Sequence, residues 1–84
     1  MKQTVKLIAG NWKMNGLAAD LAEAEALKSA LESEPSAHRV ALCPPATLIA
    51  QAAWRLKGGA VEIGGQDCHA QAAGAYTGSV SAAM

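Results

Sequence analysis

An asparagine and a lysine, Asn11 and Lys13, follow a short apolar run near the start of the chain. The lysine ammonium is a compact cation that can bind a phosphate or a developing oxyanion, and the asparagine amide can donate a hydrogen bond to the same group. In parallel α/β folds the active site lies at the carboxyl ends of the strands, where such a loop would stand. The pair therefore indicates an anion site. On spacing alone, a turn with a packed Trp12 and a solvated lysine is the more common explanation.

The histidines and cysteines form no pattern typical of a metal site or of acid–base catalysis. Cys68 and His69 are adjacent, and two neighbouring residues cannot complete a tetrahedral site. Cys43 and His38 flank a different strand. His69 lies on the same face as Lys13, but nothing beside it in the sequence orients it as an acid or a base. We expect no metal and no catalytic histidine in this chain, and a surface position for His38.

The segment from Gly74 to Gly78 is rich in glycine but lacks the lysine and the spacing of a P-loop. Its small residues and single aromatic ring suit a loop that projects into a partner, with Tyr76 or Thr77 at the tip. A loosely ordered surface loop is the alternative that these residues leave open.

The elements that position these loops alternate between strand and helix. Apolar residues recur at three- and four-residue steps from Leu17 to about Ser33, which predicts an amphipathic helix that Pro35 ends. A second helix begins after Pro44-Pro45, since proline suits the first helical position, and Gly58-Gly59 terminates it. Strands are predicted at 5–9, 40–43 and 61–66, and we expect the first of them to be buried. A loop over 67–80 follows the third strand. Ser81 is the expected N-cap of a further helix that begins with 82–84.

Two strand–helix–strand units predict a parallel sheet with right-handed crossovers. Parallel sheets are normally covered on both faces, and a three-stranded one leaves two open edges. We therefore expect residues 1–84 to form one partial domain of the α/β class, containing the first three strands and two helices of a larger structure.

The composition excludes several classes of protein. The 84 residues carry seven basic and seven acidic side chains, so the formal net charge is zero and offers no footprint for nucleic acid or an anionic membrane. No apolar run approaches the ~18 residues of a membrane span, and the stretch Leu7-Ile8-Ala9 is too short for the core of a signal peptide. Two cysteines are too few for a disulfide scaffold, so reduced thiols in a cytosolic protein are expected.

Three segments, taken in order, resemble the triose-phosphate isomerase family. The segment 9–16, Ala-Gly-Asn-Trp-Lys-Met-Asn-Gly, is similar to the opening signature of the family. Gly65-Gln66-Asp67-Cys68 followed by 74–81 resembles its third strand and the loop after it. Cys43-Pro44-Pro45 with its helix fits between them. Because the three segments span nearly the whole chain, chance is a poor explanation.

This resemblance implies a (β/α)₈ barrel of about 250 residues, of which the chain would be the N-terminal third, ending at the start of the third helix. The family interconverts dihydroxyacetone phosphate and D-glyceraldehyde 3-phosphate by enediolate-type proton transfer in glycolysis and gluconeogenesis. It uses no cofactor and works as a cytoplasmic homodimer. Asn11 and Lys13 match the substrate-binding pair of the family and are the expected catalytic and substrate-binding residues. The lysine would hold the substrate phosphate and the negative charge of the transition state.

The resemblance also implies a dimer interface. Thr77 matches the tip of the loop that reaches into the neighbouring subunit and supports its active site. Ser79 departs from the pattern, because many members carry an acidic residue there that anchors the loop. The expected interface residues are Met14, Gln66, Tyr76, Thr77 and Gly78.

The residues that complete the chemistry are not assigned in this sequence. Triose-phosphate isomerase is a standard example of catalysis by a glutamate base, a neutral histidine electrophile and a closing loop. In the family the histidine follows the fourth strand, while the glutamate and the closing loop follow the sixth, so His69 does not match that histidine. Since proton abstraction needs a base within reach of the substrate carbon, the 84-residue chain alone is predicted to be inactive.

Two other functions stay open from the sequence. An α/β fragment could act by associating with a complementary chain, since Val5–Ala9 and Val61–Ile63 would present unpaired backbone and uncovered side chains. A different phosphate-binding barrel or an open flavodoxin-like domain would show the same alternation of strands and helices along the chain, although the Asn-Trp-Lys-Met-Asn segment disfavours both.

Overall fold

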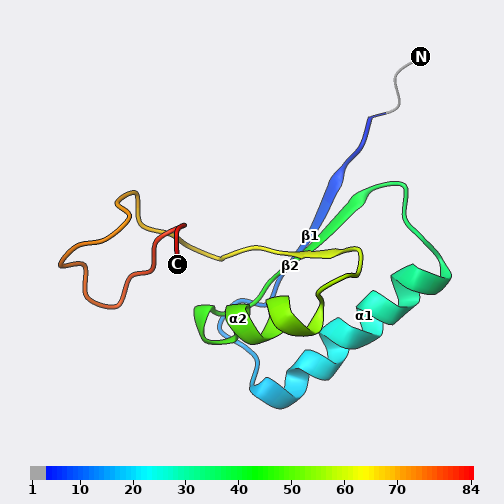
Figure 1. The fold of residues 1–84 in the computed structure, drawn as a ribbon, viewed down its shortest axis with the longest axis horizontal. Coiled ribbons are helices and arrows are strands. Elements are labelled where there is room, and N and C mark those ends of the chain that lie inside the picture. The colour runs from blue at the N-terminus through cyan, green and yellow to red at the C-terminus, as the bar shows by residue number, and fades with distance from the viewer. Residues whose placement is uncertain (1–3) are drawn as a thin grey trace.

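A computed structural model describes residues 4–84 and shows a three-stranded parallel sheet with two helices (Figure 1). The sheet has the order β1-β2-β3, and each helix connects two neighbouring parallel strands. The predicted α/β class and parallel βαβαβ order are confirmed. Of the helices described, neither is long and apolar enough to cross a membrane. The strands are β1 (Leu7–Asn11), β2 (Arg39–Cys43) and β3 (Val61–Ile63), and the helices are α1 (Leu21–Ser33) and α2 (Ala46–Arg55).

Helix α1 begins one turn later than its apolar pattern predicts. A short 3₁₀ turn, Ala18–Asp20, precedes it, and the Asp20 carboxylate accepts a hydrogen bond from the N–H of Leu17 at 2.7 Å. Leu17, which we expected on the apolar face, therefore lies outside the helix and is 76% exposed. The helix ends at Ser33, two residues before Pro35, which cannot continue it.

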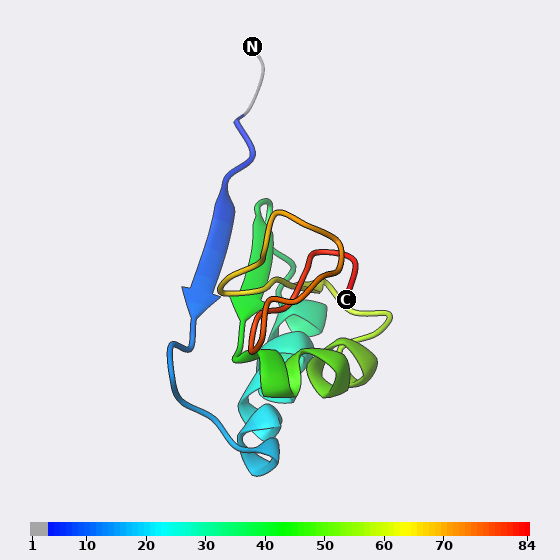
Figure 2. The same cartoon turned by 90° about the vertical axis from the view of Figure 1, so that its left-hand side faces the viewer.

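The core lies between the two helices and β3 (Figures 1 and 2). The side chains of Trp12 and Ile63 pack against both of its parts, so the loop after β1 is anchored in the core. The buried residues form two clusters, Leu21, Leu48 and Ala52 in one, and Ala24, Leu56 and Val61 in the other.

Strand β1 differs from the prediction in both position and burial. It runs from Leu7 to Asn11, and the side chains of Val5, Leu7 and Ile8 are 60%, 55% and 53% exposed. The expectation of a buried strand over 5–9 is wrong. Within the described residues β1 is an edge strand paired with β2, whereas the helices pack against each other and against β3. Figure 2 shows β1 standing apart from both helices.

Strand β3 is shorter than predicted. It ends at Ile63 and not at Gln66, although the N–H of Gly64 still donates a hydrogen bond to the Leu42 carbonyl at 2.9 Å. Beyond this bond the chain leaves β2 and becomes a long loop that projects from the rest of the molecule (Figure 1).

Ser81, the expected N-cap of a third helix, lies instead in an isolated parallel bridge with His69. A single turn follows, in which the N–H of Met84 donates to the Ser81 carbonyl at 3.1 Å. The hydroxyl oxygen of Ser81 is buried and has no hydrogen-bond partner within residues 4–84. In the described chain it therefore caps no helix.

Candidate functional site

One side chain ties the carboxyl ends of the three strands together. Gln66, which follows β3, donates one hydrogen bond from Nε2 to the Lys13 carbonyl at 2.8 Å and another to the Cys43 carbonyl at 2.9 Å. Lys13 follows β1 and Cys43 ends β2. The N–H of Trp12 donates to the same Cys43 oxygen at 3.1 Å. We call Asn11, Lys13 and Gln66 the strand-end cluster.

Lys13 has a backbone conformation that residues with a Cβ rarely adopt. Its φ is 59°, in the left-handed region. Its N–H donates to Oδ1 of Asn11 at 2.8 Å, and its carbonyl accepts the bond from Gln66. The left-handed conformation is unfavourable by roughly 1–2 kcal/mol for an L residue. Such conformations persist where surrounding contacts enforce them, and they are concentrated at functional sites.

The loop after β1 rests on the indole ring of Trp12. This ring is partly buried and packs against both core clusters, as expected from the alternative in which this segment is a turn with a packed Trp12. Nδ2 of Asn15 donates to the Trp12 carbonyl at 3.0 Å. Gly16 has a φ of 118°, and a Cβ there would lie 2.9 Å from the Trp12 ring and 3.1 Å from Leu48. Only glycine fits between this loop and the core beneath it.

The strand-end cluster presents hydrogen-bond donors and a positive charge to solvent. The amide oxygen of Asn11 is engaged by the Lys13 N–H, and the amide NH₂ group carries two further donors. Lys13 itself is exposed and carries an ammonium group. An ammonium and an amide on a fixed backbone can bind a phosphate or stabilise an oxyanion. The structure thus brings the expected substrate-binding pair together with Gln66.

Residues 69–81, which we call the projecting loop, close on themselves. The N–H of His69 donates to the Val80 carbonyl at 2.7 Å. Its imidazole stacks on the ring of Tyr76, with centroids 3.7 Å apart and an interplanar angle of 27°. Gly74, with a φ of 150°, lies against this ring, and a Cβ there would be 2.6 Å from Tyr76 Cε2. Contacts among its own residues therefore give the segment its shape.

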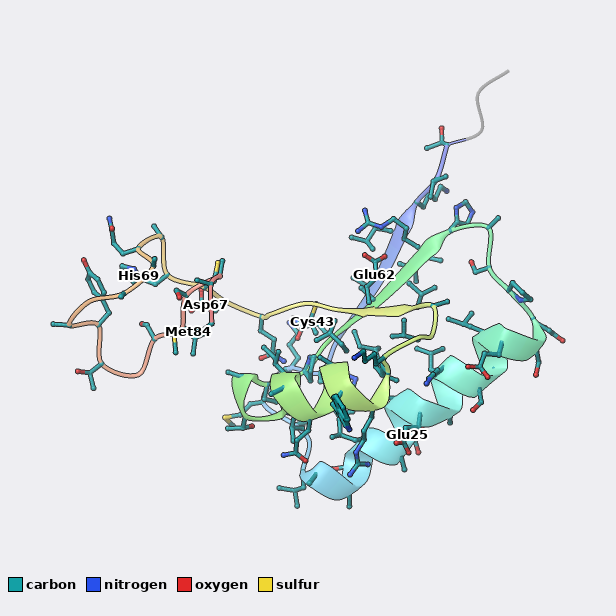
Figure 3. All side chains as sticks on the ribbon, in the orientation of Figure 1. Glu25, Cys43, Glu62, Asp67, His69 and Met84 are labelled. Carbon is teal, nitrogen blue, oxygen red and sulfur yellow. The ribbon has the colours of Figure 1, made fainter. Side chains whose placement is uncertain are left out.

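The expected interface residues occupy two separate places. Thr77 and Gly78 are exposed in the projecting loop, and Tyr76 beside them is 47% exposed. Met14 is 96% exposed, but it lies in the loop after β1. Figure 3 shows the projecting loop, marked by the His69 label, well apart from the helices.

Both histidines accept a backbone hydrogen bond through Nδ1. His38 accepts from the N–H of Lys6 at 3.0 Å, and His69 accepts from the N–H of Gln71 at 3.0 Å. His38 lies next to the amino-terminal end of β2, away from the strand-end cluster. Within residues 4–84 no group of three or more His, Cys, Asp or Glu side chains could hold a metal ion.

Comparison with known proteins decides the family. The family model for triosephosphate isomerase matches residues 6–84. The chain is 55% identical over 78 residues to the triosephosphate isomerase of Caulobacter vibrioides, and 57% identical over 79 residues to that of Dinoroseobacter shibae. The crystal structure of triosephosphate isomerase from Bartonella henselae matches with a TM-score of 0.76 at 40% identity, over 88% of this chain and 29% of that one. The chain belongs to the triosephosphate isomerase family.

Membership of the triosephosphate isomerase family confirms the resemblance inferred from the sequence. The alignments with the Caulobacter and Dinoroseobacter proteins cover 93% and 94% of this chain but 31% of each relative. The chain thus spans about a third of the length of the curated relatives it matches.

The link made by Gln66 does not follow from the sequence pattern. The resemblance predicts an interface position for Gln66, and in the structure its side chain also bonds within the chain, to residues 53 and 23 positions away. No local pattern signals contacts of that range. Gln66 is exposed, so its interface role stays a prediction beside the contacts described here.

An ion pair between β2 and β3 was also missed. Nε and Nη2 of Arg39 donate to the two carboxylate oxygens of Glu62 at 2.9 and 2.7 Å. The hydrogen bond from Arg39 holds the pKa of Glu62 below its usual range, and the same bond raises the pKa of Arg39. Glu62 lies opposite Ala41 in the sheet, so the pair is diagonal and becomes visible only when the strand register is known.

Proposed function

We propose that this protein is a triosephosphate isomerase, to which residues 1–84 contribute three strands, two helices and the phosphate-binding lysine. The reaction interconverts dihydroxyacetone phosphate and D-glyceraldehyde 3-phosphate. The observation that supports this most directly is Lys13, held in a left-handed conformation at the carboxyl end of β1 by Asn11 and Gln66.

Lys13 would act through its charge and Asn11 through hydrogen bonding. The substrate carries a phosphate, and proton transfer through an enediolate-like transition state adds negative charge at the reacting oxygen. A fixed ammonium stabilises both charges. Because the main chain of Lys13 is already held on both sides, little rearrangement is needed when the substrate binds.

The groups that move the proton are expected from other loops of the full barrel. In the family these are a glutamate base and a neutral histidine electrophile, and the reaction needs no cofactor. Residues 1–84 on their own should therefore not turn over the substrate, since binding an anion does not supply a base.

We also propose that the full protein is a cytoplasmic homodimer. The projecting loop supports this, because its internal contacts and its exposed residues Tyr76, Thr77 and Gly78 suit insertion into a neighbouring subunit at little entropic cost. Met14, 96% exposed, would lie in the same interface. Cys43 and Cys68 are free cysteines, which agrees with a reducing compartment.

The test is a barrel in which residues 6–84 replace the matching segment of the Caulobacter vibrioides enzyme, called the chimera below. At 55% identity the replaced core should be accommodated. We expect the chimera to isomerise triose phosphates in a coupled assay, and Lys57→Ala to retain this activity. Lys57 is another exposed lysine, located just before β3 at the opposite end of the strands. A dimeric chimera with native helical content and no turnover would refute the proposed function.

Association without catalysis is the second candidate, and the exposed β1 edge favours it. The side chains of Val5, Leu7 and Ile8 are more than half exposed, at 60%, 55% and 53%. An apolar edge strand is a template for a complementary strand. Light scattering on the 84-residue chain tests this function, and a monodisperse monomer would count against it.

A further inference from the structure

Gln66 uses both hydrogens of its side-chain amide. Nε2 donates to the Lys13 carbonyl at 2.8 Å and to the Cys43 carbonyl at 2.9 Å. Both partners are carbonyl oxygens, which only accept, so the amide must present its NH₂ group to them. Cys43 lies opposite Asn11 in the parallel pairing of β1 with β2, so one end of this link is fixed to the sheet. The other end holds the carbonyl of Lys13.

The Lys13 carbonyl needs a partner of this kind. At a φ of 59° a residue with a Cβ is in an unfavourable conformation that only surrounding contacts maintain. The side chain of Asn11 holds the N–H of Lys13, but the bond from Gln66 holds the carbonyl on the other side. Without that bond the Lys13 carbonyl can swing about the N–Cα bond of Lys13, and φ can relax to a negative value. Its side chain would then point in another direction.

We propose that Gln66 is a positioning residue for Lys13, holding the lysine in the left-handed conformation that directs its ammonium toward the substrate anion. This inference rests on the proposed function, in which Lys13 binds the substrate phosphate. Gln66 needs no contact with the substrate, because it acts through the main chain of Lys13. The role is separate from any contact that Gln66 makes with a second subunit.

The chemistry of the link selects glutamine over similar side chains. Glutamate at neutral pH offers only acceptors and would face two carbonyl oxygens. Asparagine is one methylene shorter and would reach the two carbonyls less well. Methionine has a similar length and no donor, so Gln66→Met removes both bonds and keeps the volume. Gln51→Met is the matched control, since Gln51 is exposed on α2.

The first experiment measures kcat and KM of these variants in the chimera. Gln66→Met should lower kcat/KM about tenfold, the loss expected from one or two hydrogen bonds that position a charged group. Gln51→Met should leave kcat/KM unchanged. In a Lys13→Ala background Gln66→Met should cause no further loss, because the residue that it positions is already gone. Equal losses in both backgrounds would show a merely structural role and overturn the proposal.

The second experiment, a crystal structure of the Gln66→Met chimera, does not depend on activity. We expect Lys13 to leave the left-handed region that its φ of 59° now occupies. A Lys13 that keeps this φ and the same carbonyl direction would overturn the proposal. If the parent chimera is inactive, the proposed function is refuted but the positioning role is not. The crystal structure of the Gln66→Met chimera would then test that role.

Discussion

The strand-end cluster and the projecting loop both follow strands and are both exposed, but they are held in different ways. In the strand-end cluster, side chains bind main-chain groups of other elements, and the bond from Gln66 to Lys13 spans 53 residues. In the projecting loop, the contacts join residues of the loop itself, through the His69–Tyr76 stack and the bond from His69 to Val80.

This difference matches the two tasks proposed above. A group that stabilises charge must be fixed relative to the rest of the active site, so its loop is bonded to the strands. A segment that enters a neighbouring subunit needs a shape of its own, so that little entropy is lost when it is ordered there. Changes at Asn11 and Lys13 should therefore alter chemistry at every protein concentration, and changes in the projecting loop should alter assembly.

The largest effect is expected from Lys13→Ala in the chimera. Removal of a charge-stabilising group typically lowers turnover by about 100- to 1,000-fold. Both kcat and kcat/KM should fall, and the loss should not depend on protein concentration, because Lys13 lies outside the projecting loop. If activity returns at high protein concentration, Lys13 contributes to dimer assembly, and the two regions do not differ in the way described here.

The next largest effect is expected from Gly16→Ala, which disturbs the packing of the loop after β1 on the Trp12 ring. The added Cβ would lie 2.9 Å from the Trp12 ring at a φ of 118°. Overpacking and backbone strain together should lower the free energy of unfolding by about 2–3 kcal/mol, and kcat/KM should fall because the loop carrying Lys13 shifts. Denaturant unfolding and steady-state kinetics on the chimera measure the two losses.

Gly58→Ala is the control for Gly16→Ala. Gly58 has a φ of 83°, and a Cβ there would meet no atom within 4 Å. Gly58→Ala should lower the free energy of unfolding by about 1 kcal/mol, because only the cost of a left-handed backbone is added, and it should leave kcat/KM unchanged. Equal losses of stability in the two variants would show that contact with the Trp12 ring is unimportant.

Gly74→Ala should have a smaller and different effect. A Cβ at Gly74 would be 2.6 Å from Tyr76, so the stack with His69 should open and the projecting loop should lose its shape. We expect the dimer dissociation constant to rise about tenfold, which corresponds to about 1.4 kcal/mol. Sedimentation over a range of concentrations measures it. If the stack of His69 on Tyr76 opens and the dimer dissociation constant does not change, the shape of the projecting loop is not important for assembly.

The sequence predicted much of the scaffold and the position of Asn11 and Lys13 at the carboxyl end of the first strand. The spacing of the leucines and the positions of the prolines predicted the two helices, because helix formation is governed by local spacing and capping. The exposure of β1 was not predictable in this way. The apolar residues Val5, Leu7 and Ile8 indicate a strand that can be buried, but they do not indicate which elements cover it, and here the helices pack against β3.

Long-range polar contacts were the other part that the sequence did not reveal. Gln66 is a polar residue just after a strand, which is typical of an exposed loop, and its two partners lie 53 and 23 positions away. Hydrogen bonds of this kind depend on where three strand ends meet. They follow from the sheet register, which a single sequence does not contain.

The smallest effect concerns the ion pair of Arg39 with Glu62. Arg39 lies at the amino-terminal end of β2, away from both regions. The hydrogen bond from Arg39 lowers the pKa of Glu62, so the stabilisation is present above the usual glutamate range and is lost as the pH falls through the lowered pKa. The raised pKa of Arg39 removes stabilisation only at very alkaline pH, where the arginine itself deprotonates.

A double-mutant cycle with Arg39→Met and Glu62→Gln in the chimera tests this ion pair. Unfolding at a series of pH values should give a small favourable coupling near neutral pH that vanishes in acid, because both side chains are well exposed, at 61% and 46%. Activity and dimer dissociation should not change, since the pair touches neither the strand-end cluster nor the projecting loop. A coupling that is the same at about pH 7 and about pH 3 would mean that the contact is not electrostatic and that packing across β2 and β3 accounts for it.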